Sequence, residues 1–153
     1  MPVVEETLCG KLCRGSESAC CDDALRISYF GGPFRNASLL RDVFPAFEVL
    51  PKTVRLQVRE TPERYPPVPF LIEFSAPVHG FSYFLETWSL FRPEVVVHPS
   101  GATGNLRYKS DNAILVACYL GAVPILADEP AYAGIGTAAG VEKAGSDPTP
   151  WTS

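Results

Sequence analysis

The chain has 153 residues, 46% of them hydrophobic and 20% charged, which is enough to bury the core of one ordinary globular domain. Its net charge is −4 and its basic residues form no stripe, so nucleic acids and anionic membrane surfaces are poor partners. No apolar run approaches the length of a transmembrane helix, and the first residues lack the apolar core of a signal peptide. We therefore expect a cytoplasmic protein.

Residues 1–23 are polar, rich in small residues and without apolar periodicity, so we expect a disordered leader or linker before a domain at 24–153. Four of the five cysteines crowd this segment: Cys9, Cys13, Cys20 and Cys21. Their spacing matches no usual zinc pattern, and free thiols are the favoured interpretation. Zinc ligation and a regulatory disulfide stay open as less favoured alternatives.

From residue 25 onward, strand and helix patterns alternate. Residues 25–30 predict a strand closed by a Gly-Gly-Pro turn, and residues 36–44 predict a short helix capped by Asn36 and stopped or kinked at Pro45. Residues 53–58 alternate apolar and polar, as in a strand with one wet face. After a proline-rich connection at 60–69, a third strand is expected at 70–74.

The second half continues the alternation. A helix at 82–92 ends before Pro93, and the valine run of the strand at 94–98 indicates burial on both faces. The next helix, 111–120, is apolar on nearly all sides, with Ser110 as its expected N-cap and Gly121 as its stop. A fifth strand is expected at 123–127 and a weak last one at 140–144.

This alternation predicts an α/β fold: a doubly wound, Rossmann-like parallel sheet of five or six strands between two helical layers. Residues 146–151 look like the entry to a further helix just before the chain stops, so we expect the domain to be truncated at its C-terminus. A response-regulator-like fold is the disfavoured alternative, because it needs acidic residues at strand ends and Asp22 and Asp23 precede the first strand.

Ligands of such sheets bind beyond the carboxyl ends of the strands, where the strand order reverses. If the first and fourth strands flank that point, the loop after the first strand and the loop after the fourth strand meet there. Both loops lead into helix N-termini, which favour an anion such as a diphosphate. Each feature also has a plain structural interpretation, as a tight turn, a surface charge or a helix cap. The candidate binding residues are Gly31, Gly32, Arg35, His98, Ser100, Lys109, Ser110 and Asn112.

Neither a G-x-G-x-x-G fingerprint nor a phosphate loop of the G-x-x-x-x-G-K-[ST] type is present. The sequence also offers no Ser-His-Asp or Cys-His grouping and no metal-ligand cluster, so it assigns no catalytic residue and no metal site.

Three segments resemble group-1 glycosyltransferases of the two-domain GT-B fold. They are residues 92–100 (RPEVVVHPS), 108–112 (YKSDN) and 114–125 (ILVACYLGAVPI), and residues 27–32 (ISYFGG) resemble the first strand of the family's C-terminal domain. The family has a strand ending in Pro-Ser, a Lys-Ser-x-Asn motif and a helix ending in Gly-x-Pro.

The resemblance implies a donor domain that binds a nucleotide-diphosphate sugar as substrate, with no cofactor and no metal. Lys109 to Asn112 would meet the diphosphate or sugar, Arg35 would face the diphosphate, and residues 78–81 would lie near the base. Many members carry two glutamates eight positions apart, and the matching residues here are Tyr108 and Val116, which accept no such hydrogen bonds.

The family's acceptor domain supplies half of the catalytic cleft, so the resemblance implies an isolated chain that is inactive unless an acceptor-domain partner completes it. The alternative function is a degenerate copy or a non-catalytic Rossmann-like interaction module, which predicts a stable complex with a separate partner and a large exposed apolar face.

Overall fold

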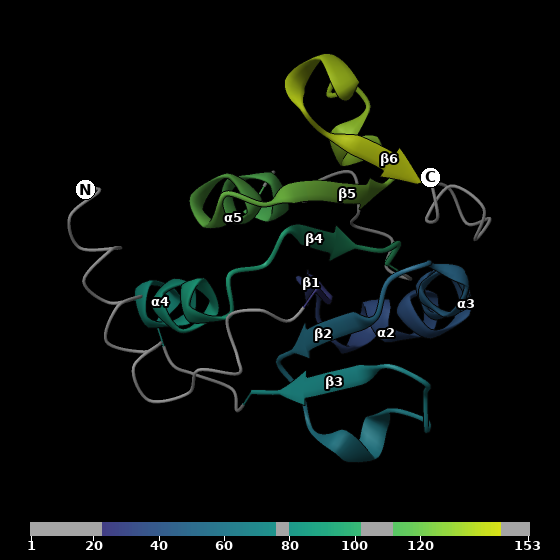
Figure 1. Cartoon of the computed structure of the whole chain (residues 1–153). Helices are drawn as coiled ribbons and strands as arrows, with labels where there is room; N and C mark the ends of the chain where they lie inside the picture. Colours follow the sequence, from purple (N-terminus) through teal and green to yellow (C-terminus); the bar gives the residue numbers. More distant parts are fainter. Residues whose placement is uncertain (1–22, 76–79, 102–111, 145–153) are drawn as a thin grey trace.

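The computed structural model describes residues 23–75, 80–101 and 112–144 (Figure 1). Six strands form one sheet, and the longer helices are α3, α4 and α5. In chain order the labelled elements are β1 (Leu25–Tyr29), α2 (Asn36–Ser38), α3 (Phe44–Val49), β2 (Val54–Val58), β3 (Leu71–Phe74), α4 (Phe81–Phe91), β4 (Val95–His98), α5 (Asn112–Leu120), β5 (Val123–Ala127) and β6 (Glu142–Ala144).

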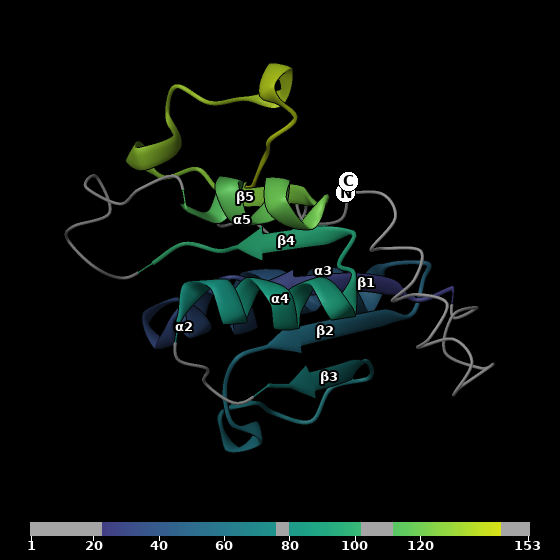
Figure 2. The same ribbon diagram turned by 90° about the vertical axis from the view of Figure 1, so that its left-hand side faces the viewer.

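All neighbouring strands pair in parallel, in the order β3-β2-β1-β4-β5-β6, and Figure 2 shows the first five stacked in this sequence. This is the doubly wound order in which the chain first builds outward from β1 and then returns to add β4 on its other side. The prediction of a Rossmann-like parallel sheet is confirmed. The response-regulator alternative is wrong, because that fold has the order 2-1-3-4-5.

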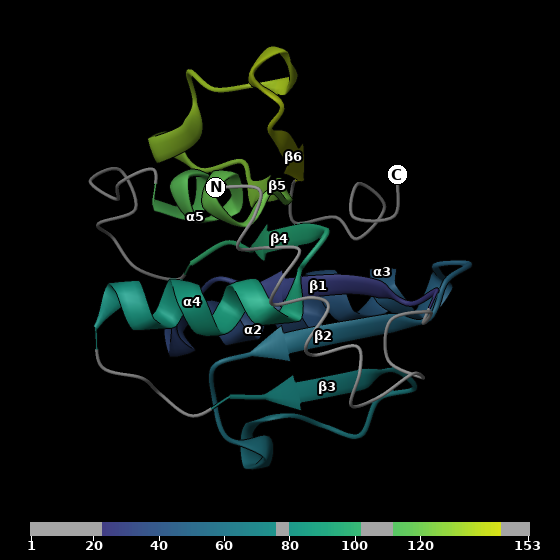
Figure 3. The same ribbon diagram turned by 60° about the vertical axis from the view of Figure 1, so that its left-hand side comes forward.

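Helices cover both faces of the sheet, α2 and α3 on one side and α4 and α5 on the other (Figures 1 and 3). The reason lies in the period of two along each strand, which sends neighbouring side chains to opposite faces. In β4, Val97 packs into the cluster beneath α3, whereas Val96 packs with Ala117 of α5. The expected two-sided burial of the valine run is confirmed.

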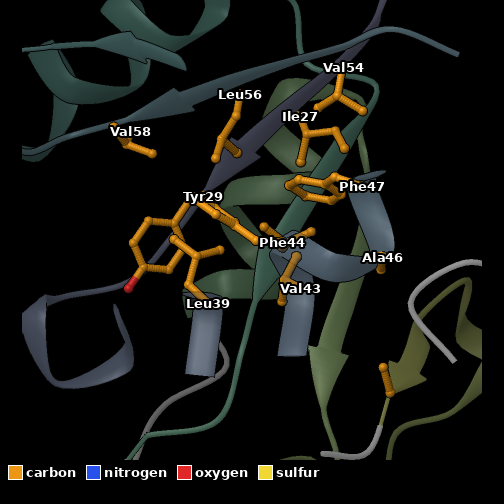
Figure 4. Close-up of a cluster of buried hydrophobic side chains, with 12 residues drawn as sticks. Ile27, Tyr29, Leu39, Val43, Phe44, Ala46, Phe47, Val54, Leu56 and Val58 are labelled. Atoms are coloured by element: carbon orange, nitrogen blue, oxygen red, sulfur yellow. The ribbon is translucent and has the colours of Figure 1, made fainter. Parts of the chain in front are cut away.

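The largest core cluster lies between β1, β2 and the α2–α3 segment (Figure 4). Ile27 and Tyr29 from β1 and Leu56 from β2 meet Leu39 and Phe44, and each is at most 4% exposed. At about 25 cal/mol per Å² of buried apolar surface, a cluster of this kind dominates the favourable side of folding. It also fixes the position of the turn that leads from β1 into α2.

Asn36 does not cap the helix at its start, contrary to the prediction. It is the first residue of α2, whose N-cap position is held by Arg35 without a side-chain cap. The Asn36 side chain instead donates to Glu60 and accepts from the Tyr29 hydroxyl. The expected break near Pro45 takes the form of a π-helical turn, Leu39–Val43, after which the helix resumes as α3.

The apolar residues of α5 are divided between the core and the surface. One side of the helix packs on the domain core, whereas Leu115 and Tyr119 are 57% and 59% exposed. The expected wet face of β2 is closed at Gln57, which is 7% exposed and accepts a 2.8 Å hydrogen bond from the Ser28 hydroxyl. The helix stop at Gly121, with φ of 67°, and the last strand are confirmed.

Candidate functional site

β1 and β4 are hydrogen-bonded neighbours in the middle of the sheet, although the whole of β2, β3 and α4 separates them along the chain. After β1 the chain turns to one face of the sheet, and after β4 it reaches α5 on the other. Because all strands run in parallel, the segments that follow β1 and β4 leave the sheet at the same edge (Figure 3). This is the switch point at which doubly wound sheets bind their ligands.

A cavity of about 230 Å³ opens at this point. It is lined by residues that follow β1 and β5, by the last residue of β4 and by the first residue of α5: Phe30, Gly31, Gly32, Phe34, Arg35, His98, Asn112 and Tyr132. Pockets for whole drug-sized ligands measure roughly 300–1,000 Å³, so this one has room for part of a nucleotide. Five of the eight predicted binding residues therefore lie together.

The turn after β1 depends on glycine because the chain passes directly over Tyr29. A Cβ atom on Gly31 would lie 2.5 Å from the Tyr29 ring, and one on Gly32 would lie 2.9 Å from the Phe34 ring. The Tyr29 hydroxyl donates a hydrogen bond either to the Gly32 carbonyl at 3.0 Å or to Asn36 Oδ1 at 2.8 Å. The turn is thereby packed onto the core and holds its backbone at the cavity.

Arg35 is buried, with 1% of its side chain exposed, and it forms an ion pair with the equally buried Glu129. Nη1 lies 2.7 Å from Glu129 Oε1, and Nη2 lies 3.1 Å from Oε2. Nη1 also donates to the carbonyl of Pro99. Arg35 is therefore not the solvated loop charge of the structural alternative, since it ties the turn after β1 to the segments after β4 and β5.

The charge of Arg35 is largely compensated by Glu129, but its hydrogen-bonding capacity is not exhausted. Arg35 Nε is buried and has no hydrogen-bond partner within the described part of the chain. A buried N–H without an acceptor costs about 1–3 kcal/mol, which an anionic ligand oxygen would recover. Arg35, which lines the cavity, thus carries one unmatched donor and little net positive charge.

His98 connects the ends of β4 and β1. Its Nδ1 is hydrogen-bonded to the Phe30 carbonyl, and because a carbonyl only accepts, Nδ1 carries the proton. His98 is 7% exposed, with its ring centroid 5.7 Å from that of Phe30 and 6.0 Å from that of Tyr132. These contacts fix the imidazole as one wall of the cavity.

Asn112 begins α5 and is exposed at the cavity. The first turn of a helix leaves backbone N–H groups without intrahelical partners, and the helix dipole adds a partial positive charge there. Within the described residues, the first turn of α5 holds no acidic side chain, whereas Asp111 directly precedes it in the sequence and its charge would oppose an anion. The backbone N–H groups at the Asn112 end favour an anion, and Asp111 acts against it.

Ser100 does not line the cavity, although its two neighbours in the chain bind the Arg35–Glu129 pair. Pro99 accepts from Arg35, and the Gly101 backbone N–H donates to Glu129 Oε1 at 2.8 Å. Lys109 and Ser110 lie outside the described residues, as do residues 78 and 79 of the segment 78–81 expected near the base. Ser100 therefore lies beside the cavity and is not part of its lining.

A second polar cluster, which the sequence analysis missed, lies beyond the ends of β1 and β2. Asn36 Nδ2 donates to Glu60 Oε2 at 2.6 Å, and Tyr65 approaches the same oxygen at 3.5 Å. Burial, together with the nearby negative charge of Glu60, raises the pKa of both Tyr29 and Tyr65 above its ordinary value. Both phenols therefore stay protonated as donors.

Glu129 is the other functional residue that sequence reasoning missed. It follows β5 at the same edge of the sheet as the predicted loops, directly before Pro130. An acidic residue at the carboxyl end of an apolar strand was the available signal. Its role depended on a partner 94 positions away, and no local pattern reveals that pairing.

Val116, where the resembled family carries a ribose-binding glutamate, is a core residue. It is 1% exposed and packs with Phe84 and Trp88 of α4. Its side chain packs α5 against α4 and has no atom that accepts a hydrogen bond.

No protein-family model matches the chain, and neither the curated proteins nor the solved structures contain a significant match. Among residues 23–75, 80–101 and 112–144, no three His, Cys, Asp or Glu side chains gather as a metal-ion set. Within the same residues, no helix combines the length and the apolar character needed to cross a bilayer.

Proposed function

We propose that this domain binds a nucleotide-diphosphate sugar at the switch point between β1 and β4 and serves as the donor half of a glycosyltransferase. One observation carries the proposal: the Gly31–Gly32 turn and the Asn112 end of α5 line the same cavity. The resemblance implies that Lys109 to Asn112 meet the diphosphate or sugar and that Arg35 faces the diphosphate, and the fold class predicts that the turn after β1 lies beside them. The convergence of these segments is what a shared anion site requires.

The chemistry of the cavity supports an anionic ligand. It combines the N-terminal end of α5, the backbone of a glycine turn and the unpaired Nε of Arg35, all of which are hydrogen-bond donors or positive dipole ends. Such groups stabilise the negative charge that develops on a leaving diphosphate without a metal ion. In the proposal, Lys109 and Ser110 add a cation and a hydroxyl to this set.

The proposed donor half binds the sugar nucleotide but does not transfer the sugar by itself. In the family that the sequence resembles, a second α/β domain holds the acceptor and closes over the donor. The proposed partner is therefore an acceptor domain, and the proposed location is the cytosol. Donor sugar, acceptor and stereochemical outcome are properties of the completed cleft.

Isothermal titration with UDP-glucose and GDP-mannose tests the proposal. Asn112→Ala and Lys109→Ala are expected to weaken binding several-fold each, because each removes a polar group from the anion site. Lys52→Ala is the matched control, since Lys52 is an exposed lysine just before β2, at the opposite edge of the sheet, and should leave affinity unchanged. Failure of the wild-type protein to bind either ligand would overturn the donor-site proposal.

A second candidate function, a non-catalytic interaction module, is favoured by the apolar residues exposed on α4 and α5. These two helices pack side by side and carry five of the large hydrophobic residues that the described chain exposes: Phe81, Tyr83, Leu90, Leu115 and Tyr119. Sedimentation velocity over a range of concentrations tests this function. A complex that forms with the wild-type protein and dissociates in the double variant Leu115→Ser, Tyr119→Ser would favour it. A monomer at every concentration would count against self-association.

A further inference from the structure

We infer that Glu60 is the residue that binds the ribose of the nucleotide, so that the nucleoside lies over the ends of β1 and β2. The inference rests on the proposed nucleotide site and adds the residue and the ligand group to it. It starts from Val116, whose side chain is fully buried in the core of the domain. A ribose hydroxyl bound by this domain needs a different acceptor.

Glu60 has one carboxylate oxygen that accepts no hydrogen bond within the described residues. Its side chain is 8% exposed, and its Oε1 atom is buried without a hydrogen-bond partner in the residues described. A carboxylate accepts up to about four hydrogen bonds, and leaving one oxygen unmatched away from water is costly. The hydroxyl of a ribose is a neutral donor of the kind that this oxygen lacks.

The other carboxylate oxygen holds Glu60 in place. Oε2 accepts from Asn36 at 2.6 Å and from Tyr65 at 3.5 Å, and the Arg64 guanidinium lies 3.9 Å away. Arg64 and the two donors hold the carboxyl group in one orientation. A preorganised acceptor of this kind binds a hydroxyl more strongly than a mobile surface glutamate does, because less ordering has to take place on binding.

The same contacts link Glu60 to the proposed diphosphate site. Asn36 accepts from the Tyr29 hydroxyl, which also lies 3.0 Å from the carbonyl of Gly32, and Gly32 lines the cavity. Glu60 itself lies two residues beyond β2, the strand that pairs with β1. In sheets with this strand order, an acidic side chain in the second βα segment is well placed for the ribose of a nucleotide whose phosphates rest on the first turn.

The test compares ribonucleotides with their deoxy forms. For wild-type protein, UDP and GDP are expected to bind at least about tenfold more tightly than 2′,3′-dideoxy-UDP and 2′,3′-dideoxy-GDP, as the loss of a hydrogen bond to a charged group implies. Glu60→Gln should reduce this preference to about threefold or less, because the amide oxygen is a weaker, neutral acceptor. Glu63→Gln, an exposed change in the same segment, is the control and should keep the full preference.

Three outcomes are distinguishable. Equal affinity of wild-type protein for ribo- and dideoxynucleotides overturns the role of Glu60 and leaves the proposed donor site standing. A ribose preference that survives Glu60→Gln unchanged also overturns it. No nucleotide binding at all overturns both. The wild-type comparison needs no variant, so it decides the matter even if Glu60→Gln does not fold.

Discussion

The guanidinium of Arg35 donates two hydrogen bonds to the carboxylate of Glu129, with N–O distances of 2.7 and 3.1 Å, and both side chains are almost fully buried. The pair connects the turn after β1 with the segment after β5, and Glu129 also receives the backbone N–H of Gly101 after β4. Three loops at the carboxyl edge of the sheet are thereby joined. The geometry of the proposed donor site depends on this one interaction.

Breaking the pair should destabilise the protein strongly. Glu129→Ala leaves the Arg35 charge buried and unpaired, and we expect a loss of about 3–5 kcal/mol in the free energy of unfolding by urea titration. The exposed Lys52–Asp23 pair, 3.5 Å apart, is the control, and Asp23→Ala should cost under about 1 kcal/mol. A loss in Glu129→Ala no larger than in this control would contradict the role assigned to the pair.

The glycine turn makes a second prediction. Gly31→Ala places a methyl group against the Tyr29 ring, and overpacking of this kind costs about 1–3 kcal/mol. Gly134→Ala is the matched control, since nothing lies within 4 Å of the added carbon there. Thermal unfolding should separate the two variants. Equal melting temperatures would show that the turn is not packed on Tyr29.

Stability should fall at alkaline pH. Burial, and then the neighbouring Tyr65 and Glu60, raise the pKa of Tyr29 above its ordinary value of 10.0. A phenol with a raised pKa in the folded state contributes stability that is complete below pH 10 and is lost as pH rises further, at up to about 1.4 kcal/mol per pH unit. Tyr65 acts in the same direction.

The corresponding measurement is the urea midpoint between pH 8 and pH 11. Wild-type protein should be flat up to about pH 9.5 and then decline, and Tyr29→Phe should decline less steeply because the ionising group is gone. Tyr83→Phe, an exposed tyrosine on α4, is the control and should follow the wild type. Identical slopes for all three proteins would argue against a buried Tyr29 phenol.

Restoring a glutamate at Val116 should not create a ribose site. Val116→Glu puts a carboxylate between Phe84 and Trp88, where it has no partner, and should unfold or severely destabilise the domain. The neighbouring Leu115→Glu changes an exposed position and should be nearly neutral. Circular dichroism with urea titration reads both. A stable Val116→Glu protein with improved nucleotide affinity would refute the assignment of Val116 to the core.

Much of the fold follows from local patterns. The valine run of β4 predicted a central strand, and the glycine at position 121 predicted the end of α5, because backbone conformation and two-sided burial leave direct traces in the sequence. The place of β1 beside β4 was a hypothesis drawn from the fold class, and the structure confirms it.

Long-range polar contacts left no such trace. Asn36 is a residue type that often caps helices, yet its side chain forms hydrogen bonds with Glu60 and Tyr29. These two residues are distant in the sequence and lie close together only in the folded domain. Arg35 lines the cavity beyond β1 and β4, but its pairing with Glu129 depends on how β5 lies beside β4. The apolar residues of α5 do not by themselves distinguish a helix that is buried on every side from one whose outer side is exposed.

The most direct test of the central claim is a two-dimensional ¹H–¹⁵N NMR titration of the labelled protein with UDP-glucose and GDP-mannose. The account predicts that the amide signals of Gly31, Gly32, Gly101 and Asn112 shift together in a saturable manner, because these residues surround the switch point between β1 and β4. Saturable shifts confined to the opposite edge of the sheet, around Lys52, or no shifts with either ligand, would contradict it.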